Sequence, residues 1–442
     1  TGMDLQMGAI NVDEWYSAKK DQWPLNYGTP ISQEGVRMLV HDPEAGIKGP
    51  HDATTLLGEM QNKTAADGVS GWSVTRSNLE QMNQILELLD EGLRQGALGL
   101  GSMVAYMQDG LSTYEQFQAQ RVVARYGRVT AVHSRFHGNP VNPESALGFD
   151  EVFTNASLLG APLLYQHNNE HSWWEIEEKL QLARAQGMNM WSEYYPYDAA
   201  STAIGSAMLK PASFVDKFGG SYEKQMYDPT QDKFLTQEEY EAIVKSDPGR
   251  LVVFYNPKRL EWMPYWFAME HMTLASDSLY SGKSWDADFT EYKGHPRTGG
   301  TRGKGFRMAR EAGVPLMFTI AQASYWPAKH LGDTGLVAMQ QRGRIQVGKV
   351  ADITIFDPET ITDNSTYKIG EQGKPTTGIP YVIVNGKMVV KDSTFQKGLW
   401  AGQPIRFPVE QKARFEPVTV EAWTDSHTFL FDGCPGGMHR DN

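Results

Sequence analysis

Residues 98–133 read LGLGSMVAYMQDGLSTYEQFQAQRVVARYGRVTAVH, and this stretch has the pattern of a strand, a helix and a second strand. The apolar run 98–102 has the length of a short buried strand. A helix is expected to open at Ser112, where Ser-x-x-Glu forms a capping-box pattern, and to stop at Gly127. The second strand is expected at 129–133. Short strands separated by an amphipathic helix are typical of parallel pairing.

The same alternation extends over most of the chain. A helix is expected after the capping box at 77–80, and another between 172–175 and Gly187. Strand and helix in regular alternation indicate a parallel sheet or a barrel. The six strands that we can place are expected at 24–27, 98–102, 129–133, 162–167, 188–195 and 272–276.

Two parts of the chain break this alternation. Residues 205–270 are rich in Lys, Asp, Tyr and Pro and are expected to form an insertion that covers one face of the main domain, 1–340. Residues 381–390 read YVIVNGKMVV, a hairpin with Asn-Gly at its turn. We therefore expect 341–395 to be a small β domain and 396–442 to be a tail that packs along the body.

Composition and charge exclude several classes of function. The chain has 442 residues, enough for one barrel-sized domain with an appendage. Its formal net charge of −12 repels phosphate backbones, which argues against nucleic-acid binding. The single cysteine, Cys434, excludes an intrachain disulfide and any multi-thiolate metal site made by this chain alone. No apolar run reaches the roughly 20 residues of a membrane span. The sequence does not distinguish a cytoplasmic from a periplasmic location.

Four polar residues follow predicted strands and are candidates for a functional site. They are His133, His167, Asp277 and Tyr195. In a barrel the carboxyl ends of the strands converge on one mouth, where two imidazoles and a carboxylate suit a divalent metal, above all zinc. A lone histidine at a strand end is more often a hydrogen-bonded structural residue. The presence of both histidines and Asp277 at equivalent positions favours the metal site.

A set of short motifs resembles the amidohydrolase superfamily, and within it the N-acyl-D-amino-acid deacylase (D-aminoacylase) group. Each motif is weak alone, but the ordered set is specific and spans most of residues 20–395. The matching segments, in chain order, are 96–100 with Tyr106, 133–135, 166–169, 195–201, 276–277, 295–297, 327–332, 343–358 and 382–386. The resemblance implies a TIM-like (β/α)8 barrel with a small β-sandwich domain, of which 341–395 would be the C-terminal part.

The resemblance also implies roles for individual residues. His133 and His167 would be metal ligands of the fifth and sixth barrel strands, binding one or two zinc ions or another divalent metal. Asp277, on the eighth strand, would join the metal site and move a proton from the attacking water to the leaving amine. The substrate-binding residues implied by the motifs are Tyr106, Arg135, Asn169, Tyr195 and Arg297, of which Arg297 would pair with the substrate carboxylate.

The chain departs from the family pattern at its start. The family's first strand carries His-x-His and its second strand a metal-binding Cys, and neither is present here. We therefore expect that this chain lacks the first two strands of the barrel. A barrel without them would have an open edge with unpaired backbone groups. A companion N-terminal polypeptide from a processed precursor would complete the barrel and the site. The competing explanations are a start omitted from this sequence and a degenerate, metal-free relative.

Two further departures fall inside the matching motifs. Asn169 stands where the family has Lys, and an amide cannot replace a cation electrostatically. His137 stands where the family often has an acidic residue. Both changes bear on substrate identity more than on reaction class.

The sequence predicts a metal-dependent amidohydrolase that cleaves the amide bond of N-acyl amino acids, with a D preference open. The alternatives are a cyclic-amide hydrolase or a dipeptidase with the same machinery. A third alternative is a non-catalytic scaffold subunit in which the two histidines are structural. The acyl group, the metal count and assembly into a homo-oligomer also stay open.

Overall fold

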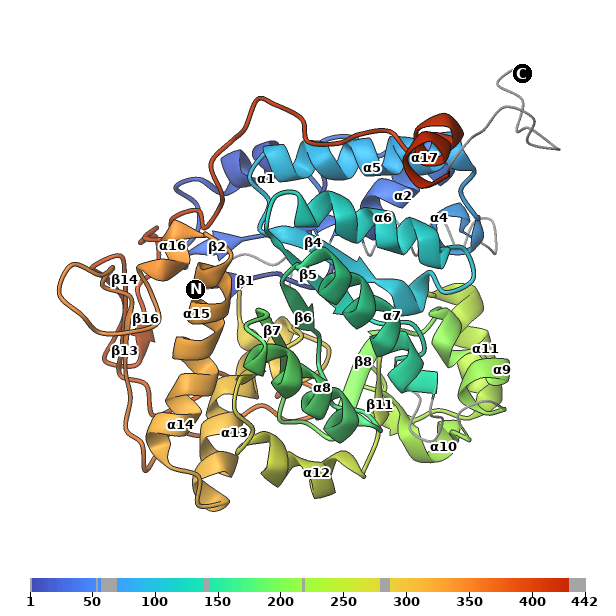
Figure 1. The fold of residues 1–442 in the computed structure, drawn as a ribbon. Helices are drawn as coiled ribbons and strands as arrows, with labels where there is room; N and C mark the ends of the chain where they lie inside the picture. Colours follow the sequence, from blue (N-terminus) through green and yellow to red (C-terminus); the bar gives the residue numbers. More distant parts are fainter. Residues whose placement is uncertain are drawn as a thin grey trace, which may run out of the picture.

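The parallel sheet expected from the sequence forms the centre of the molecule (Figure 1). The computed structural model describes residues 2–52, 55–56, 70–137, 144–216, 219–278 and 287–428. Its largest sheet has six parallel strands in the order β12-β7-β6-β5-β4-β3. These strands are β3 (Ile31–Ser32), β4 (Gly99–Met103), β5 (Val129–His133), β6 (Leu163–Tyr165), β7 (Met190–Tyr194) and β12 (Met272–Leu274).

The strand expected at 24–27 is wrong in its bounds, and two short strands were not predicted. β2 (Tyr27–Gly28) overlaps the expected strand only at Tyr27 and continues after Thr29 and Pro30 into β3, which was not predicted. β1 (Gly2–Met3), also not predicted, pairs in parallel with β2. Strands of two residues are too short to show a period-two pattern. Among the described residues, β12 and β3 are the end strands of the six-stranded sheet, and β1 extends the parallel arrangement through its pairing with β2, the segment just before β3.

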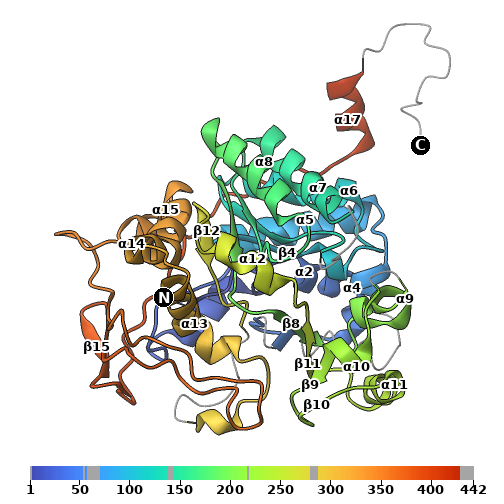
Figure 2. The same cartoon turned by 90° about the horizontal axis from the view of Figure 1, so that it is seen from below.

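Four helices connect consecutive parallel strands and cover the outer face of the sheet (Figures 1 and 2). They are α5 (Leu79–Arg94), α6 (Thr113–Ala124), α7 (Glu144–Leu159) and α8 (Trp173–Ala185). The capping box of α5 lies one residue later than expected, between Asn78 and Gln81. Ser112 caps α6 as predicted and accepts a hydrogen bond from the Glu115 amide at 3.1 Å. Ser172 is the N-cap residue of α8, as predicted, but its φ is 71° and its side chain makes no capping hydrogen bond.

The insertion is a structured unit that begins before the predicted boundary. Its sheet has four antiparallel strands in the order β10-β9-β11-β8. The strands are β8 (Ala199–Ala203), β9 (Met226–Asp228), β10 (Lys233–Phe234) and β11 (Leu251–Tyr255). Its helices are α9 (Pro211–Phe214), α10 (Tyr222–Gln225), α11 (Gln237–Ser246) and α12 (Arg259–Trp266). β8 and β11 lie beside the carboxyl ends of the parallel strands (Figure 2).

The C-terminal β domain lies on the opposite side of the molecule from the insertion (Figures 1 and 2). It is a single antiparallel sheet, β13 (Ile353–Ile355), β14 (Tyr381–Val384), β15 (Lys387–Lys391) and β16 (Thr394–Phe395), in the segment expected to be the C-terminal part of a β-sandwich. The Asn-Gly hairpin is confirmed: Asn385 and Gly386 have φ of 48° and 78°, as the tight turn requires. Asn26 accepts a hydrogen bond from Asn385 at 2.6 Å and thereby joins this sheet to the body.

The remaining helices frame these sheets. Those before the first long strand are α1 (Val12–Lys19), α2 (Gln33–His41) and α4 (Gly71–Val74). Those after β12 are α13 (Arg297–Glu311), α14 (Leu316–Ile320), α15 (Trp326–Asp333), α16 (Val337–Gln340) and α17 (Val420–His427). Within the described ranges, no helix is both long and apolar enough to cross a membrane.

The first part of the tail runs along the body. Ile405 donates to the Tyr27 carbonyl at 2.7 Å, and Phe407 donates to the Gly96 carbonyl at 3.1 Å. Residues 429–442, which include Cys434, lie outside the described residues.

A buried ion pair ties α2 to α6. Arg37 pairs with Glu115, and the two side chains are 0% and 1% exposed. The Arg37 guanidinium also donates to the carbonyls of Trp72 at 2.8 Å and Thr75 at 2.7 Å. In the part of the chain that the structure describes, Glu115 is the acidic partner of this buried Arg37 charge.

Glu115→Gln is expected to lower the free energy of unfolding by about 3–5 kcal/mol, because the Arg37 charge then stays buried without a carboxylate. Urea denaturation measures this change. The matched control is Glu416→Gln, which removes a carboxylate that is 79% exposed and pairs with Arg125. That variant is expected to change stability by less than about 1 kcal/mol. Equal, small changes in both variants would contradict the expectation.

Candidate metal centre

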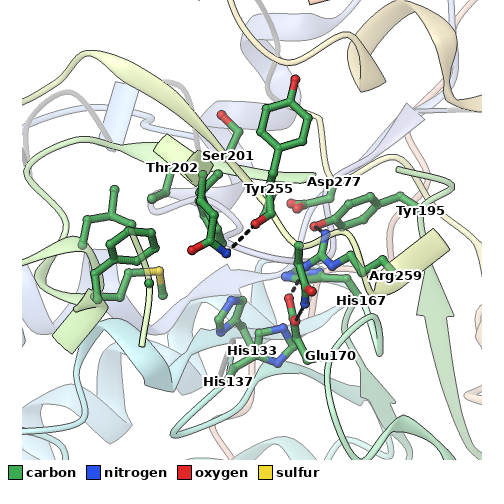
Figure 3. Close-up of a pocket in the computed structure, with 18 of the residues that line it drawn as sticks. His133, His137, His167, Glu170, Tyr195, Ser201, Thr202, Tyr255, Arg259 and Asp277 are labelled. Atoms are coloured by element: carbon green, nitrogen blue, oxygen red, sulfur yellow. Dashed lines mark hydrogen bonds and ion pairs between the residues drawn. The ribbon is translucent and has the colours of Figure 1, made fainter. Parts of the chain in front are cut away.

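A cavity of about 90 Å³ lies where the carboxyl ends of the parallel strands meet the insertion. Polar and charged side chains from several different elements converge on it (Figure 3). They include His133, His137, His167, Glu170, Tyr195, Arg259 and Asp277. This is the edge of the sheet at which sites of α/β proteins assemble.

Three imidazoles form the most compact group in this cavity. His133 ends β5, His137 lies in the loop after it, and His167 follows β6. The ring centroids are 4.0 Å apart for His133 and His137, 4.9 Å for His133 and His167, and 5.1 Å for His137 and His167. One nitrogen from each ring lies within 4.8 Å of the others. All three side chains are buried.

Each ring has a buried nitrogen without a hydrogen-bond partner among the described residues. These atoms are His133 Nδ1, His137 Nε2 and His167 Nδ1. Burial lowers the pKa of His133 and of His137 well below the usual imidazole value, and the neighbouring imidazoles add to the shift. Both rings are therefore neutral at pH 7 and keep a free lone pair, which is the form that binds metals.

The donor set fits a zinc ion. Three neutral nitrogen ligands with one open position are a known arrangement for catalytic zinc. Three buried nitrogens without partners are otherwise costly, because a buried polar atom that makes no hydrogen bond loses its hydration without compensation. A divalent cation bound by these three imidazole nitrogens would provide the missing partner for each of them.

The backbone bends sharply at two of the predicted site residues. His167 has a φ of 29° and Asp277 a φ of 47°, a region that residues with a Cβ rarely adopt. Such strained positions cost on the order of 1–3 kcal/mol and cluster at functional sites. At both strand ends the bend turns the chain into the loop that lines the cavity.

Asp277 lies beside the imidazoles but is outside the compact group of three. Its carboxylate pairs with Arg297 at 2.6 Å, and the two side chains are 13% and 6% exposed. Arg297 is the first residue of α13, and its guanidinium lies 5.0 Å from the centre of the Tyr195 ring. The pair therefore holds a carboxylate in the cavity that the imidazoles also line.

Two tyrosines line the cavity with their hydroxyl groups held in place. The Tyr106 hydroxyl lies 3.0 Å from the Thr202 hydroxyl of β8, and burial raises the pKa of Tyr106 to about 12. The Tyr195 hydroxyl accepts a hydrogen bond from Arg259 at 2.9 Å, and burial also raises its pKa. Both hydroxyls are therefore protonated at neutral pH and can donate to a ligand.

The sequence analysis missed a buried pair behind Tyr195. Arg259, the first residue of α12, pairs with Glu170, which also accepts a hydrogen bond from Asn256 at 3.0 Å. Arg259 belongs to the insertion and Glu170 to the loop after β6, so no spacing in the sequence connects them. The structure brings them together only through the packing of the insertion on the sheet.

Three predicted substrate-binding residues, Arg135, Asn169 and Arg297, do not line this cavity. Arg297 lines a second cavity and reaches this one through its ion pair with Asp277. Arg135 is committed elsewhere: it binds Glu151 through two hydrogen bonds of 2.8 and 3.1 Å and donates to the carbonyls of Gln108 and Leu111. Asn169 is fully buried and bonds to the backbone of Tyr195 in both directions, at 3.1 and 3.3 Å. Asn169 thus positions Tyr195, and the structure gives neither Arg135 nor Asn169 a free group facing the cavity.

The other predicted residues are brought together. His133, His167, Tyr106, Tyr195 and Asp277 all line the cavity, although they come from five different segments of the chain. Arg297 joins them through Asp277. His137 had been noted only as a departure from the family pattern. The sequence did contain a signal for this role, because His137 lies only four residues after His133, in the loop that follows the same strand.

Comparison with solved structures identifies the class of fold. A crystal structure of D-aminoacylase, described as defining a subset of amidohydrolases, aligns with a TM-score of 0.64 and 19% identity over 89% of this chain and 74% of that chain. N-acyl-D-glutamate deacylase from Bordetella bronchiseptica, in complex with zinc and a phosphonate inhibitor, aligns with a TM-score of 0.66 and 19% identity over 90% and 75%. The chain has the fold of these amidohydrolases.

Comparison of the sequence with characterised proteins finds relatives that are deacylases by name. D-aminoacylase of Alcaligenes xylosoxydans xylosoxydans is 23% identical over 349 residues, covering 74% of this chain and 65% of that protein. N-acyl-D-glutamate deacylase of the same organism is 24% identical over 313 residues, covering 68% and 59%. No protein-family model matches. The resemblance to N-acyl-D-amino-acid deacylases is confirmed, and the chain spans less than two thirds of the length of these relatives.

Proposed function

We propose that this chain forms most of a metal-dependent amidohydrolase that hydrolyses the amide bond of N-acyl-D-amino acids. The observation that carries the proposal is the group of three buried imidazoles whose nitrogens lack hydrogen-bond partners among the described residues, in a cavity that the Asp277 carboxylate also lines. The D-amino-acid class comes from the names of the relatives.

His133, His137 and His167 would hold the metal ion. Zinc bound there would supply Lewis-acid polarisation of the amide carbonyl and would lower the pKa of a coordinated water. The two raised-pKa tyrosines, Tyr106 and Tyr195, stay protonated and would donate hydrogen bonds to the substrate carbonyl. The Tyr195 hydroxyl oxygen accepts the hydrogen bond from Arg259, so the hydroxyl proton is available to donate to another group.

Asp277 would move the proton in this reaction. Its carboxylate takes a proton from the attacking water while the new carbon–oxygen bond forms. It then gives that proton to the amide nitrogen as the carbon–nitrogen bond breaks, which yields a carboxylic acid and a free amino acid. Arg297 positions Asp277 through their 2.6 Å ion pair, and its remaining donors can bind the substrate carboxylate.

The proposal is tested by measuring the release of free amino acid from matched N-acyl-D- and N-acyl-L-amino acids. Hydrolysis of the D substrates is expected, with loss of activity after removal of the metal by a chelator and recovery on addition of zinc. Absence of hydrolysis of every N-acyl amino acid by the zinc-supplemented protein would overturn it.

We also propose that a polypeptide segment outside residues 1–442 completes the parallel strands into a (β/α)8 barrel. A second cavity, of about 310 Å³, separates the two edge strands β1 and β12. Its walls include apolar side chains from both sides, among them Met3, Leu5, Trp191, Leu274 and Leu331. Within the described residues, β1 and β12 each pair on one side only, and these edges together with the apolar lining suit an additional strand.

Intact-mass measurement and peptide mapping of the protein from its natural source test this second proposal. Peptides beyond this sequence that carry a His-x-His motif, on a longer chain or on a co-purifying polypeptide, are expected. A fully active protein whose mass is accounted for by these 442 residues alone would contradict it.

A further inference from the structure

One part of the cavity carries no charge. The charged lining residues Glu170, Arg259 and Asp277 gather with the imidazoles (Figure 3). Apart from Arg259, the insertion contributes uncharged side chains to the lining: the polar Ser201, Thr202, Gln225 and Asn256, and the apolar Ala200, Met208, Leu209, Phe214 and Phe254. We call these five apolar side chains the apolar wall of the cavity.

The apolar wall is a fixed surface of the insertion. Ala200 on β8 lies opposite Phe254 on β11, so the two side chains share one face of the antiparallel sheet. Leu209 and Phe214 belong to the buried cluster of this unit, and Met208 and Phe254 pack against it. Gly220 keeps the wall compact, because a Cβ there would come within 2.7 Å of the Phe214 carbonyl oxygen.

The position of the carboxylate site decides which part of a substrate would reach this wall. Arg297 lines the second cavity, and Asp277 lines both. If the substrate carboxylate binds Arg297 and the amide carbonyl lies at the imidazoles, the acyl group extends away from Arg297. The direction that remains open within the first cavity leads to Ala200, Met208 and Phe254.

We infer that the apolar wall binds the acyl group of the substrate, and that the preferred acyl group is an extended hydrocarbon chain and not acetyl. The inference rests on the proposed function. Water in this part of the cavity meets few polar partners, so an alkyl chain that displaces it gains the free energy of apolar burial. The gain corresponds to about fourfold in kcat/KM per buried methylene.

The test compares N-acetyl, N-butanoyl and N-hexanoyl derivatives of one D-amino acid. The hexanoyl substrate is expected to exceed the acetyl substrate in kcat/KM by about 10²-fold. Phe254→Ser is expected to lower this ratio by about tenfold. The matched control is Phe234→Ser, the same substitution on an exposed phenylalanine of the same sheet outside the cavity, which should leave the ratio unchanged.

The ratio separates this inference from the proposed function. Hydrolysis of the acetyl substrate with a hexanoyl-to-acetyl ratio of one or less overturns the inference and leaves the deacylase proposal standing. A steep dependence on the length of the amino-acid side chain, with none on the acyl chain, would also overturn it, because the wall would then bind the other half of the substrate. No hydrolysis of any member of the series counts against the proposed function itself.

Discussion

His167→Ala is expected to lower kcat/KM by at least about 10³-fold and to remove zinc from the protein. The Lewis-acid effect of a bound metal is worth several kcal/mol of transition-state stabilisation, and each 1.4 kcal/mol corresponds to a tenfold change in rate. His167 is buried next to two other imidazoles, and its ring has a nitrogen without a partner in the described part of the chain. Steady-state kinetics and metal analysis of the same sample measure both effects.

The same experiment on His137 tests the ligand that the sequence analysis did not assign. His137→Ala is expected to reduce zinc content together with activity, because its ring centre lies only 4.0 Å from that of His133. His427→Ala is the control, since His427 is exposed on α17 and makes its hydrogen bond to the Trp423 carbonyl. Full zinc content and full activity in His167→Ala would show that the imidazoles are structural.

Asp277→Asn is expected to lower kcat by about 10²–10⁴-fold while zinc stays bound. Proton transfer by a positioned carboxylate contributes a factor of this size, and an amide cannot accept the proton. Zinc is expected to remain because Asp277 lies outside the group of three imidazoles and pairs with Arg297 instead. The measurement is kcat at saturating substrate with zinc content determined in parallel.

Glu193→Gln is a useful comparison for this variant. Glu193 is the carboxylate of β7 that comes within 3.9 Å of His167 but has no place in the proton transfer, so a much smaller loss is expected. If Asp277→Asn loses zinc in proportion to activity, Asp277 is a metal ligand and the division of roles proposed here is wrong. An unchanged kcat would show that Asp277 takes no part in the proton transfer.

The sequence predicted the parallel strands and their polar ends well, because both depend on local patterns. A short apolar run followed by histidine at 129–133 and again at 162–167 marks strand and site together. The hairpin at Asn385 was equally predictable, since its two turn residues must adopt positive φ. Helix starts were predicted to within one residue where a side chain caps the first turn, as at Ser112.

Features that depend on distant packing were not predictable. Arg135 and Asn169 sit in matching motifs, but their side chains bond to Glu151 and to the Tyr195 backbone, and neither partner is set by local spacing. The pairing of Arg259 with Glu170 spans 89 residues and forms only when the insertion folds onto the sheet. β1 is recognised only from its partner β2, because two residues carry no periodic signal.

Anomalous diffraction at the zinc absorption edge, from crystals of the zinc-supplemented protein, would locate the metal ion itself. We expect a peak bonded to one nitrogen each of His133, His137 and His167, at about 2.0–2.1 Å. Crystals that show the three rings without a peak between them, or a zinc ion bound only at other residues, would contradict this expectation.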